Sequence, residues 1–346
     1  MNPADPAGPR LPIVAAPMAG GPSTPALVAA VTAAGGYGYL AAGYLTADEL
    51  AARMAELRQR TDGPFGVNLF LPDPSGRTRR REEAVIAYGR RLVPEAEAVR
   101  VDLGDPHPAD DPDDGPGLDA KLRVLAADPP DTISLTFGLP DPDRLAALRA
   151  TGARLVATVT SPEEARDAER LGLDGLVVQG TDAGGHRGTH RVVDEPNDDD
   201  TLDLLVAIRP RTSLPMIAAG GVADRAGVRR ALDAGATQVQ LGTAFLRTDE
   251  AGTSATHRDA LGDPTFSGTT VTRAFTGRAA RALTNRFAVE HGPSAPAAYP
   301  ELHYLTRPIR TAAAKAGDAT RLHLWAGVHF RRAAEGPASE VVRGLV

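Results

Sequence analysis

Short apolar runs alternate with longer amphipathic stretches over most of the chain. The runs are bounded by Gly, Pro and polar residues, and they predict eight β-strands at residues 13–18, 37–43, 65–71, 132–138, 155–160, 175–180, 215–222 and 238–246. Helical patterns separate most of them. Repeated strand–helix units are typical of a parallel sheet. Eight such units predict an α/β protein with a closed (β/α)8 TIM barrel rather than an open sheet.

Local helix signals support this alternation. A helix over 25–34 begins with a proline and ends before two glycines. Thr46 is followed three residues later by Glu49, and Ser161 by Glu164, which is the spacing of a capping box. Another helix is predicted over 225–234. The helices therefore fall between the predicted strands.

The alternation breaks in two places. A long charged helix is predicted over 79–101, and the acidic, Pro- and Gly-rich stretch 104–117 is interpreted as a solvated, mobile loop. After residue 246 the chain becomes mostly helical and polar. We expect residues 10–72, 120–248 and 309–334 to form the barrel, and residues 73–119 and 249–308 to form a smaller, mostly α-helical lid.

Composition narrows the classes of protein. The chain has 346 residues and a net charge of -6, with basic residues scattered rather than clustered, so no nucleic-acid partner is expected. It has 0 Cys, which excludes disulfides, thiolate metal sites and a cysteine nucleophile. The polar start, Met1 to Arg10, is unlike a signal peptide, and no apolar run reaches the roughly 18 residues of a membrane span. We expect a cytoplasmic enzyme without a membrane partner. No pattern indicates an oligomeric state.

Glycines follow the last two predicted strands. In (β/α)8 enzymes the active site lies at the carboxyl ends of the strands, and phosphate often binds to the loops after strands seven and eight. Gly220, Gly221, Gly242 and Thr243 stand in those loops, where backbone N–H groups can approach a phosphate. The alternative is that these glycines only permit tight turns. No GxxxxGK[ST] or GxGxxG motif indicates an NTPase or a Rossmann domain.

His186 is the strongest candidate for catalysis. It lies in the Gly-rich loop 180–188, after the sixth predicted strand, and imidazole can exchange a proton at neutral pH. The alternative is a structural histidine in a turn. His190 invites a metal site, but Gly188 and the absence of an HExxH pattern disfavour one, so no metal is expected. No serine has a GxSxG context. Most of the remaining histidines are expected to be surface or structural residues: His107, His257, His291, His303, His323 and His329.

Several ordered motifs resemble those of the nitronate monooxygenases. Residues 12–45 resemble the opening motif of that family, and GVNLF at 66–70 resembles its second motif. GTDAGGHRG at 180–188 resembles its histidine loop, and AAGGV at 218–222 resembles its phosphate loop. LGTAF and FTGRAARALTNRF are also typical of the family. The resemblance covers nearly the whole chain.

This resemblance implies an FMN cofactor and the oxidation of alkyl nitronates by O2 to carbonyl compounds and nitrite. The matching motif implies that His186 is catalytic, as the base if a neutral nitroalkane is the substrate. The resemblance places FMN contacts at Ala16, Pro17, Met18, Asn68, Gln179, Gly184, Gly185, Gly220, Gly221, Gln240, Gly242 and Thr243.

The chain also departs from the family pattern. Asp182 stands where many members have Glu, and His329 stands where a glycine is expected. Tyr299, His303 and Arg307 are spaced to line one helical face above the site, where they would bind the substrate, and relatives often have Tyr and Lys at the last two positions. The alternative is an ordinary lid surface. Pro308 is expected to limit that helix.

Two other functions remain open at this point. An FMN-dependent NAD(P)H:quinone or enoyl-thioester reductase would share the fold and a histidine in a Gly-rich loop. A flavin- or phosphosugar-binding barrel without catalysis would need no base, so His186 favours an enzyme.

Overall fold

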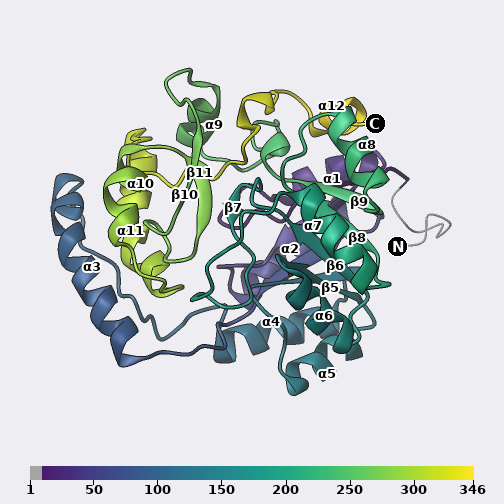
Figure 1. The fold of residues 1–346 in the computed structure, drawn as a ribbon, viewed down its shortest axis with the longest axis horizontal. Helices are drawn as coiled ribbons and strands as arrows, with labels where there is room; N and C mark the ends of the chain where they lie inside the picture. Colours follow the sequence, from purple (N-terminus) through teal and green to yellow (C-terminus); the bar gives the residue numbers. More distant parts are fainter. Residues whose placement is uncertain (1–9) are drawn as a thin grey trace.

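The barrel closes on itself. The structure is a computed structural model that describes residues 10–346. Of the polar N-terminal segment, only Arg10 is therefore among the described residues. Eight parallel strands are joined in the order β1-β2-β3-β4-β5-β6-β8-β9, and β1 also pairs with β9 (Figure 1). The strands are β1 (Ile13–Ala15), β2 (Tyr37–Ala41), β3 (Gly66–Phe70), β4 (Thr132–Thr136), β5 (Arg154–Val159), β6 (Gly175–Gln179), β8 (Met216–Ala219) and β9 (Gln238–Leu241). The expected (β/α)8 barrel is therefore confirmed.

Helices cover the outside of the barrel. They are α1 (Pro25–Ala33), α2 (Ala47–Arg60), α4 (Gly115–Ala127), α5 (Pro142–Ala150), α6 (Pro162–Arg170), α7 (Thr201–Ile208), α8 (Arg225–Asp233) and α12 (Ala338–Gly344). The capping box at α2 is confirmed: the Thr46 hydroxyl accepts from the Glu49 backbone at 3.2 Å, and the Glu49 carboxylate accepts from the Thr46 backbone at 2.8 Å. Apolar side chains fill the barrel interior, including Tyr37, Tyr39 and Val177.

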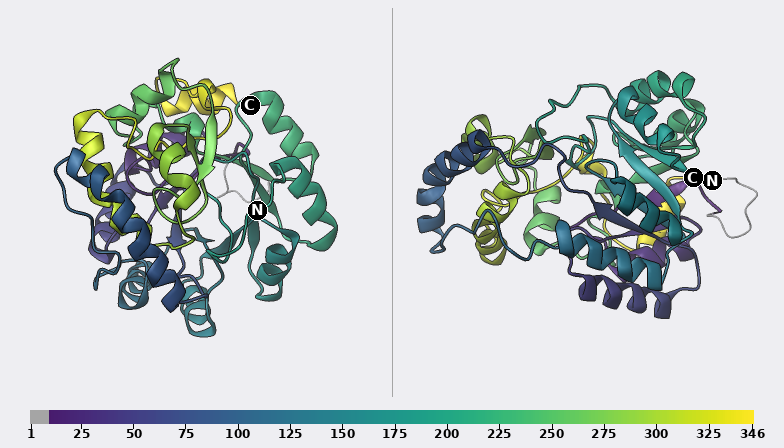
Figure 2. Two further views of the ribbon diagram at one scale, coloured as in Figure 1. Left: turned by 60° about the vertical axis from the view of Figure 1, so that its left-hand side comes forward. Right: turned by 90° about the horizontal axis from the view of Figure 1, so that it is seen from below.

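A second group of elements lies over one side of the barrel. It contains α3 (Arg79–Ala98), α9 (Ala255–Gly262), α10 (Arg286–His291) and α11 (Glu301–Ala316). Figure 2 shows α3 beside α11 in both views, and the two helices share a separate apolar core. This group also contains an antiparallel sheet in the order β10-β11-β7, made of β7 (Gly185–His186), β10 (Thr269–Thr272) and β11 (Ala280–Leu283). Sequence patterns missed this sheet because its strands are short and because β7 pairs with β11 over a long sequence distance.

Two expectations about α11 are wrong. The helix does not stop near Pro308 but continues through it to Ala316. It begins at Glu301, after a cis peptide bond between Tyr299 and Pro300, so Tyr299 precedes the helix instead of lying on its face. The expected domain boundaries at 119/120 and 308/309 fall inside α4 and α11. We therefore propose a division into barrel and lid whose boundaries lie outside α4 and α11, so that neither helix is split between the two parts.

The acidic stretch before α4 is not simply a solvated loop. Asp111 accepts a hydrogen bond from the Tyr304 hydroxyl at 2.8 Å, and the Gly104 N–H donates to the Leu305 carbonyl at 3.0 Å. Asp113 accepts from the backbone N–H of Tyr44 at 2.7 Å. The loop therefore connects the barrel with α11. Within residues 10–346, no helix is long and apolar enough to cross a membrane.

Candidate active site

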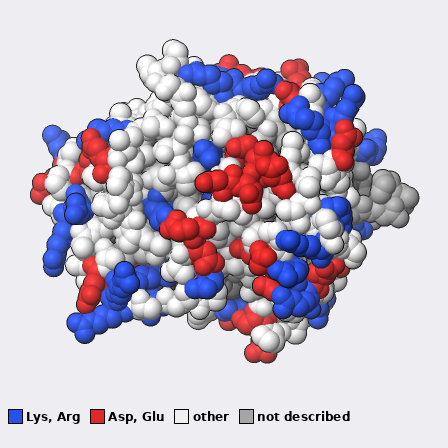
Figure 3. All heavy atoms as spheres, viewed as in Figure 1, with Lys and Arg blue, Asp and Glu red and all other residues white. Residues whose placement is uncertain are grey.

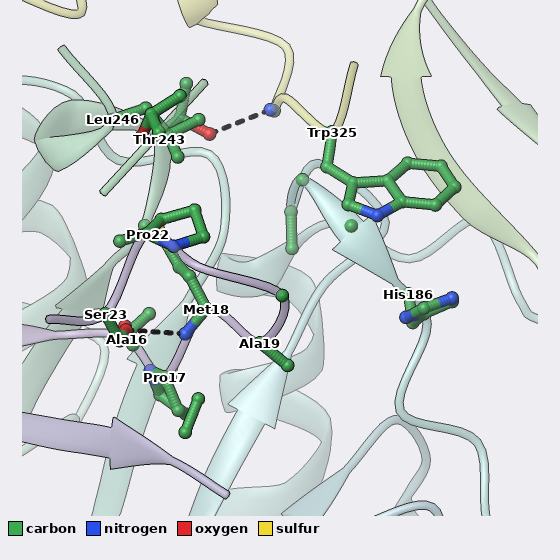
Figure 4. Close-up of a pocket in the computed structure, with 18 of the residues that line it drawn as sticks. Ala16, Pro17, Met18, Ala19, Pro22, Ser23, His186, Thr243, Leu246 and Trp325 are labelled. Carbon is green, nitrogen blue, oxygen red and sulfur yellow. Dashed lines mark hydrogen bonds between the residues drawn. The ribbon is translucent and has the colours of Figure 1, made fainter. Parts of the chain in front are cut away.

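A cavity of about 730 Å³ opens at the carboxyl ends of the barrel strands. The residues named from the sequence line it, with the exception of Tyr299. They are Ala16, Pro17, Met18, Asn68, Gln179, Gly184, Gly185, His186, Gly220, Gly221, Gln240, Gly242, Thr243, His303 and Arg307. Figure 4 shows the rings of His186 and Trp325 on one side of the cavity, opposite the segment from Ala16 to Ala19. The cavity therefore collects residues from both ends of the chain.

The loops after β8 and β9 form a narrow cradle in the cavity wall. Gly220 and Gly221 adopt positive φ angles of 106° and 68°. A Cβ atom on Gly221 would lie 2.9 Å from a carboxylate oxygen of Asp182, so only glycine fits there without displacement. The Thr243 hydroxyl accepts from the Gly327 N–H at 3.0 Å, which joins the C-terminal segment to this cradle. Backbone N–H groups in such a cradle suit a phosphate.

The floor of the cavity holds polar groups among apolar ones. The Ser23 hydroxyl accepts from the Met18 N–H at 2.8 Å and donates to the Ala16 carbonyl at 3.3 Å, which fixes the loop after β1. Asn68 is buried, and its amide donates to the Ser134 hydroxyl at 2.9 Å. The side-chain oxygen of Gln240 is buried and has no hydrogen-bond partner among the described residues. An orphaned polar atom of this kind fits a polar, flat ligand lying on the floor.

Gln179 positions the histidine loop. Its amide nitrogen donates to the His186 carbonyl at 2.9 Å, and its amide oxygen accepts from the Gly188 N–H at 2.7 Å. Both polar atoms of the side chain are therefore in use. Gln179 lines the cavity, where the resemblance implies a contact with the cofactor. Its amide also holds the histidine loop in place.

His186 lies among aromatic rings and cations. Its ring centroid is 5.3 Å from that of Trp325 and 5.6 Å from those of Phe137 and Tyr299. Burial is the main cause that lowers its pKa to about 3, and the positive charges of Arg278 and Arg310 contribute. The imidazole is therefore neutral at neutral pH.

The hydrogen bonds of His186 indicate which nitrogen can accept a proton. Its Nε2 lies 2.9 Å from the Thr276 hydroxyl, and that hydroxyl can donate to the Arg278 carbonyl at 3.4 Å. This arrangement favours an Nε2–H that donates to Thr276. Nδ1 is then the unprotonated nitrogen, and the ring can accept a proton there.

Tyr44 and His303 form a stacked pair in the cavity wall. Their ring centroids are 4.0 Å apart with an interplanar angle of 6°. Tyr44 has a positive φ of 69°, and its hydroxyl accepts from the Tyr299 hydroxyl at 3.1 Å. Tyr299 therefore contacts the site through Tyr44 and the ring of His186, and its side chain is buried behind the lining.

Several lining residues were missed from the sequence. His257, His323 and His329 line the cavity, although most of the scattered histidines were expected to be surface or structural residues. Burial lowers the pKa of His257 to about 4. Arg310 and Trp325 also line the cavity, although only the spacing of Arg310, seven residues after His303 on one helix, could have indicated this from the sequence.

The charge of the lining is opposite to that of the chain. Five cationic residues line the cavity, namely Arg53, Arg307, Arg310, Lys315 and Arg332, and Asp182 is the only acidic residue among the lining residues. The chain as a whole carries -6. On the face in Figure 3, basic and acidic side chains are interspersed, and acidic ones gather near the middle. The cavity therefore favours an anionic ligand.

One cluster outside the cavity has the composition of a metal site. Glu95, Glu290 and His291 place their ligand atoms close together. The Glu95 carboxylate, however, accepts from Arg286 at 2.6 and 2.8 Å and from Arg321 at 2.7 Å. Hydrogen bonding to Arg286 is the main cause that lowers the pKa of Glu95 to about 2. This cluster is an ion-pair network, in which the guanidinium groups occupy the carboxylate.

The fold and the cavity together define a (β/α)8-barrel enzyme with a histidine beside a phosphate cradle. Known proteins specify the family: the sequence pattern of the nitronate monooxygenases matches residues 9–346, and the chain belongs to that family. It is therefore an oxidoreductase of a flavin-dependent family that acts on small molecules.

Individual relatives agree with this assignment. The chain is 40% identical to a nitronate monooxygenase of Pseudomonas aeruginosa, over 98% of this chain and 96% of the relative. The solved structure of a nitroalkane oxidase from Streptomyces ansochromogenes is similar with a TM-score of 0.90 and 49% identity, over 97% of this chain and 94% of that one. FabK from Thermotoga maritima is similar with a TM-score of 0.72 and 26% identity, over 97% and 91%.

Proposed function

We propose that this protein is an FMN-dependent nitronate monooxygenase that oxidises alkyl nitronates with O2 to carbonyl compounds and nitrite. The observation that carries the proposal is the neutral imidazole of His186 at a cationic cavity that ends in a glycine cradle. The first feature suits proton management, the second an anionic substrate, and the third the phosphate of a flavin nucleotide.

The residues present fit FMN. The cradle of Gly220, Gly221, Gly242 and Thr243 would hold the phosphate through backbone N–H groups. Gln240, with its unpartnered oxygen, would meet the polar edge of the ring system. The bound flavin would supply electron transfer between substrate and O2, which no side chain can provide.

The protein groups then bind the substrate and manage a proton. A nitronate is an anion, and the lining cations would hold it beside His186, with Tyr299, His303 and Arg307 as the proposed substrate residues. If a neutral nitroalkane is the substrate, His186 would be the base that removes its proton, because burial keeps the imidazole neutral. A preformed nitronate needs no such step.

Anaerobic mixing tests the proposal. Purified protein with confirmed bound FMN is mixed separately with an ethyl nitronate, with propionate 3-nitronate and with NADH, and the flavin absorbance is followed. We expect the nitronates, and not NADH, to change the absorbance, and O2 consumption to yield nitrite. If NADH alone bleaches the flavin, the reaction is that of the NAD(P)H-dependent reductase, and the monooxygenase assignment is wrong.

A further inference from the structure

Arg310 is a buried cation in the cavity wall without a carboxylate partner. The residue is only 6% exposed, and it lines the cavity. Nε donates to the Thr306 hydroxyl at 3.0 Å, and Nη2 donates to the His303 carbonyl at 2.7 Å. Among residues 10–346, no carboxylate forms an ion pair with it. Buried charges are nearly always paired, so an uncompensated one facing a cavity points to an anionic ligand.

The neighbouring histidines cannot neutralise this charge. Nη2 of Arg310 lies 3.3 Å from Nδ1 of His303, and Nη1 lies 3.4 Å from both ring nitrogens of His323. Burial, with the charge of Arg310 next in size, lowers the pKa of each imidazole well below its ordinary value. Burial also lowers the pKa of Arg310, to about 10, which leaves the guanidinium charged at neutral pH. The cluster therefore carries one net positive charge.

One guanidinium nitrogen, Nη1, has only weak partners. The contacts of Nη1 at 3.4 Å to two nitrogens of one ring are too long for a strong hydrogen bond. Nε and Nη2, by contrast, are anchored, so the plane of the group is fixed. His303 is itself held by stacking on Tyr44. Arg307, three residues earlier on the same helix, is exposed and lacks this anchoring.

We propose that Arg310, together with His303 and His323, forms a binding subsite for a planar two-oxygen anion. This inference rests on the proposed function and deepens it: the anion is either the nitronate group itself or a carboxylate that the same substrate carries. Nη1 would donate to one oxygen of such a group, and the ring N–H of a neutral His303 or His323 would donate to the other. The bound anion would also neutralise the buried charge.

Trp325 provides a readout that does not depend on turnover. It is the only tryptophan of the chain, and its ring centroid is 5.3 Å from that of His323. The as-purified protein is titrated with acetate at constant ionic strength, with chloride as the comparison, while tryptophan fluorescence and Tm are recorded. We expect a saturable response to acetate alone, together with a rise in Tm. A wild-type protein that responds to acetate no more than to chloride has no such subsite, and the inference is overturned.

Variants locate the response. R310Q should raise the Kd of acetate at least about tenfold, because a charge-assisted hydrogen bond is lost. R310K keeps the charge but loses the planar guanidinium group, so its Kd for acetate should lie between those of wild type and R310Q. It replaces R310Q in the test if R310Q does not fold. R91Q makes the same change on the exposed side of α3 and should leave the Kd unchanged. Acetate affinity in R310Q within twofold of wild type would overturn the assignment to Arg310.

Steady-state kinetics distinguish the two sources of the anion. If Arg310 holds the nitronate group, R310Q raises KM for ethyl nitronate and for propionate 3-nitronate by similar factors. If it holds a carboxylate, only the carboxylate-bearing substrate is affected. Unchanged KM values for both would overturn the role in substrate binding. A wild-type protein that oxidises neither nitronate contradicts the proposed function, while the acetate titration still decides whether the subsite exists.

Discussion

One substitution at Lys121 tests the buried ion pair between Lys121 and Asp113. The ammonium group of Lys121 is fully buried at 0% exposure, donates to the Ala42 carbonyl at 2.8 Å, and pairs with Asp113. The second oxygen of Asp113 holds the backbone of Tyr44 in its left-handed conformation. K121M keeps most of the side-chain volume and removes the charge. It should therefore destabilise the protein by leaving the Asp113 carboxylate buried and unpaired.

The size of the effect depends on pH. Burial is the main cause that raises the pKa of Asp113 to about 6, and the charge of Lys121 opposes this rise. Without Lys121 the pKa of Asp113 rises further, so the folded variant keeps a proton above pH 6 that the unfolded chain releases. Its free energy of unfolding then falls by about 1.4 kcal/mol per pH unit relative to wild type. At pH 5.5 we expect K121M to lower the free energy of unfolding by about 1–2 kcal/mol, because hydrogen bonds are lost. At pH 7.5 we expect it to be lowered by about 3–4 kcal/mol.

Urea unfolding at the two pH values measures this cost. The double variant K121M/D113N removes the carboxylate charge as well, and at pH 7.5 it should be more stable than K121M by about 1–2 kcal/mol. The reasoning is refuted if K121M costs the same at both pH values, or if the double variant is no more stable than the single one.

Three further predictions concern the cavity. H186A should lower kcat/KM for a neutral nitroalkane by about 10²–10⁴-fold and that for a nitronate much less, as measured by O2 consumption. G221A places a Cβ 2.9 Å from an Asp182 oxygen at a φ of 68° and should lose most of its bound flavin, as measured by flavin absorbance per protein. Burial lowers the pKa of His186 to about 3 and that of His257 to about 4, and it lowers those of His303 and His323 well below their ordinary value. The unfolded chain therefore binds more protons below pH 6.5, and stability should fall by roughly 5 kcal/mol between pH 7.5 and 5.5, as measured by urea unfolding.

Each of these predictions has a matched comparison. G76A also changes a glycine with positive φ, at 65°, but nothing lies within 4 Å of the added Cβ, so its flavin content should equal that of wild type. Equal flavin loss in G76A and G221A would mean that backbone strain, not the cradle, is responsible. Equal losses on nitroalkane and nitronate in H186A would contradict the role as a base. A stability that does not change between pH 7.5 and 5.5 would contradict the neutral state of the buried histidines.

Local patterns were sufficient for the elements of the barrel. Apolar runs and capping residues report on neighbours within a few positions, so the strands and the box at Thr46 and Glu49 could be predicted. The carboxyl ends of parallel strands meet at one end of a closed barrel. For that reason His186, Gly220 and Gln240, which follow or end different strands, could be brought to one site from the sequence.

The sequence by itself thus determined the family, the barrel and most of the floor of the cavity, because each follows from short motifs or from the order of strands. Only the tertiary structure decided what covers that floor. Arg310, His323 and Trp325 are distant in sequence from the barrel motifs. The backbone of Tyr44 is held by Asp113, which belongs to an acidic loop whose composition predicts a solvated segment. Burial, charge compensation and ring stacking are sums over contacts between distant segments, and no local pattern in the chain encodes them.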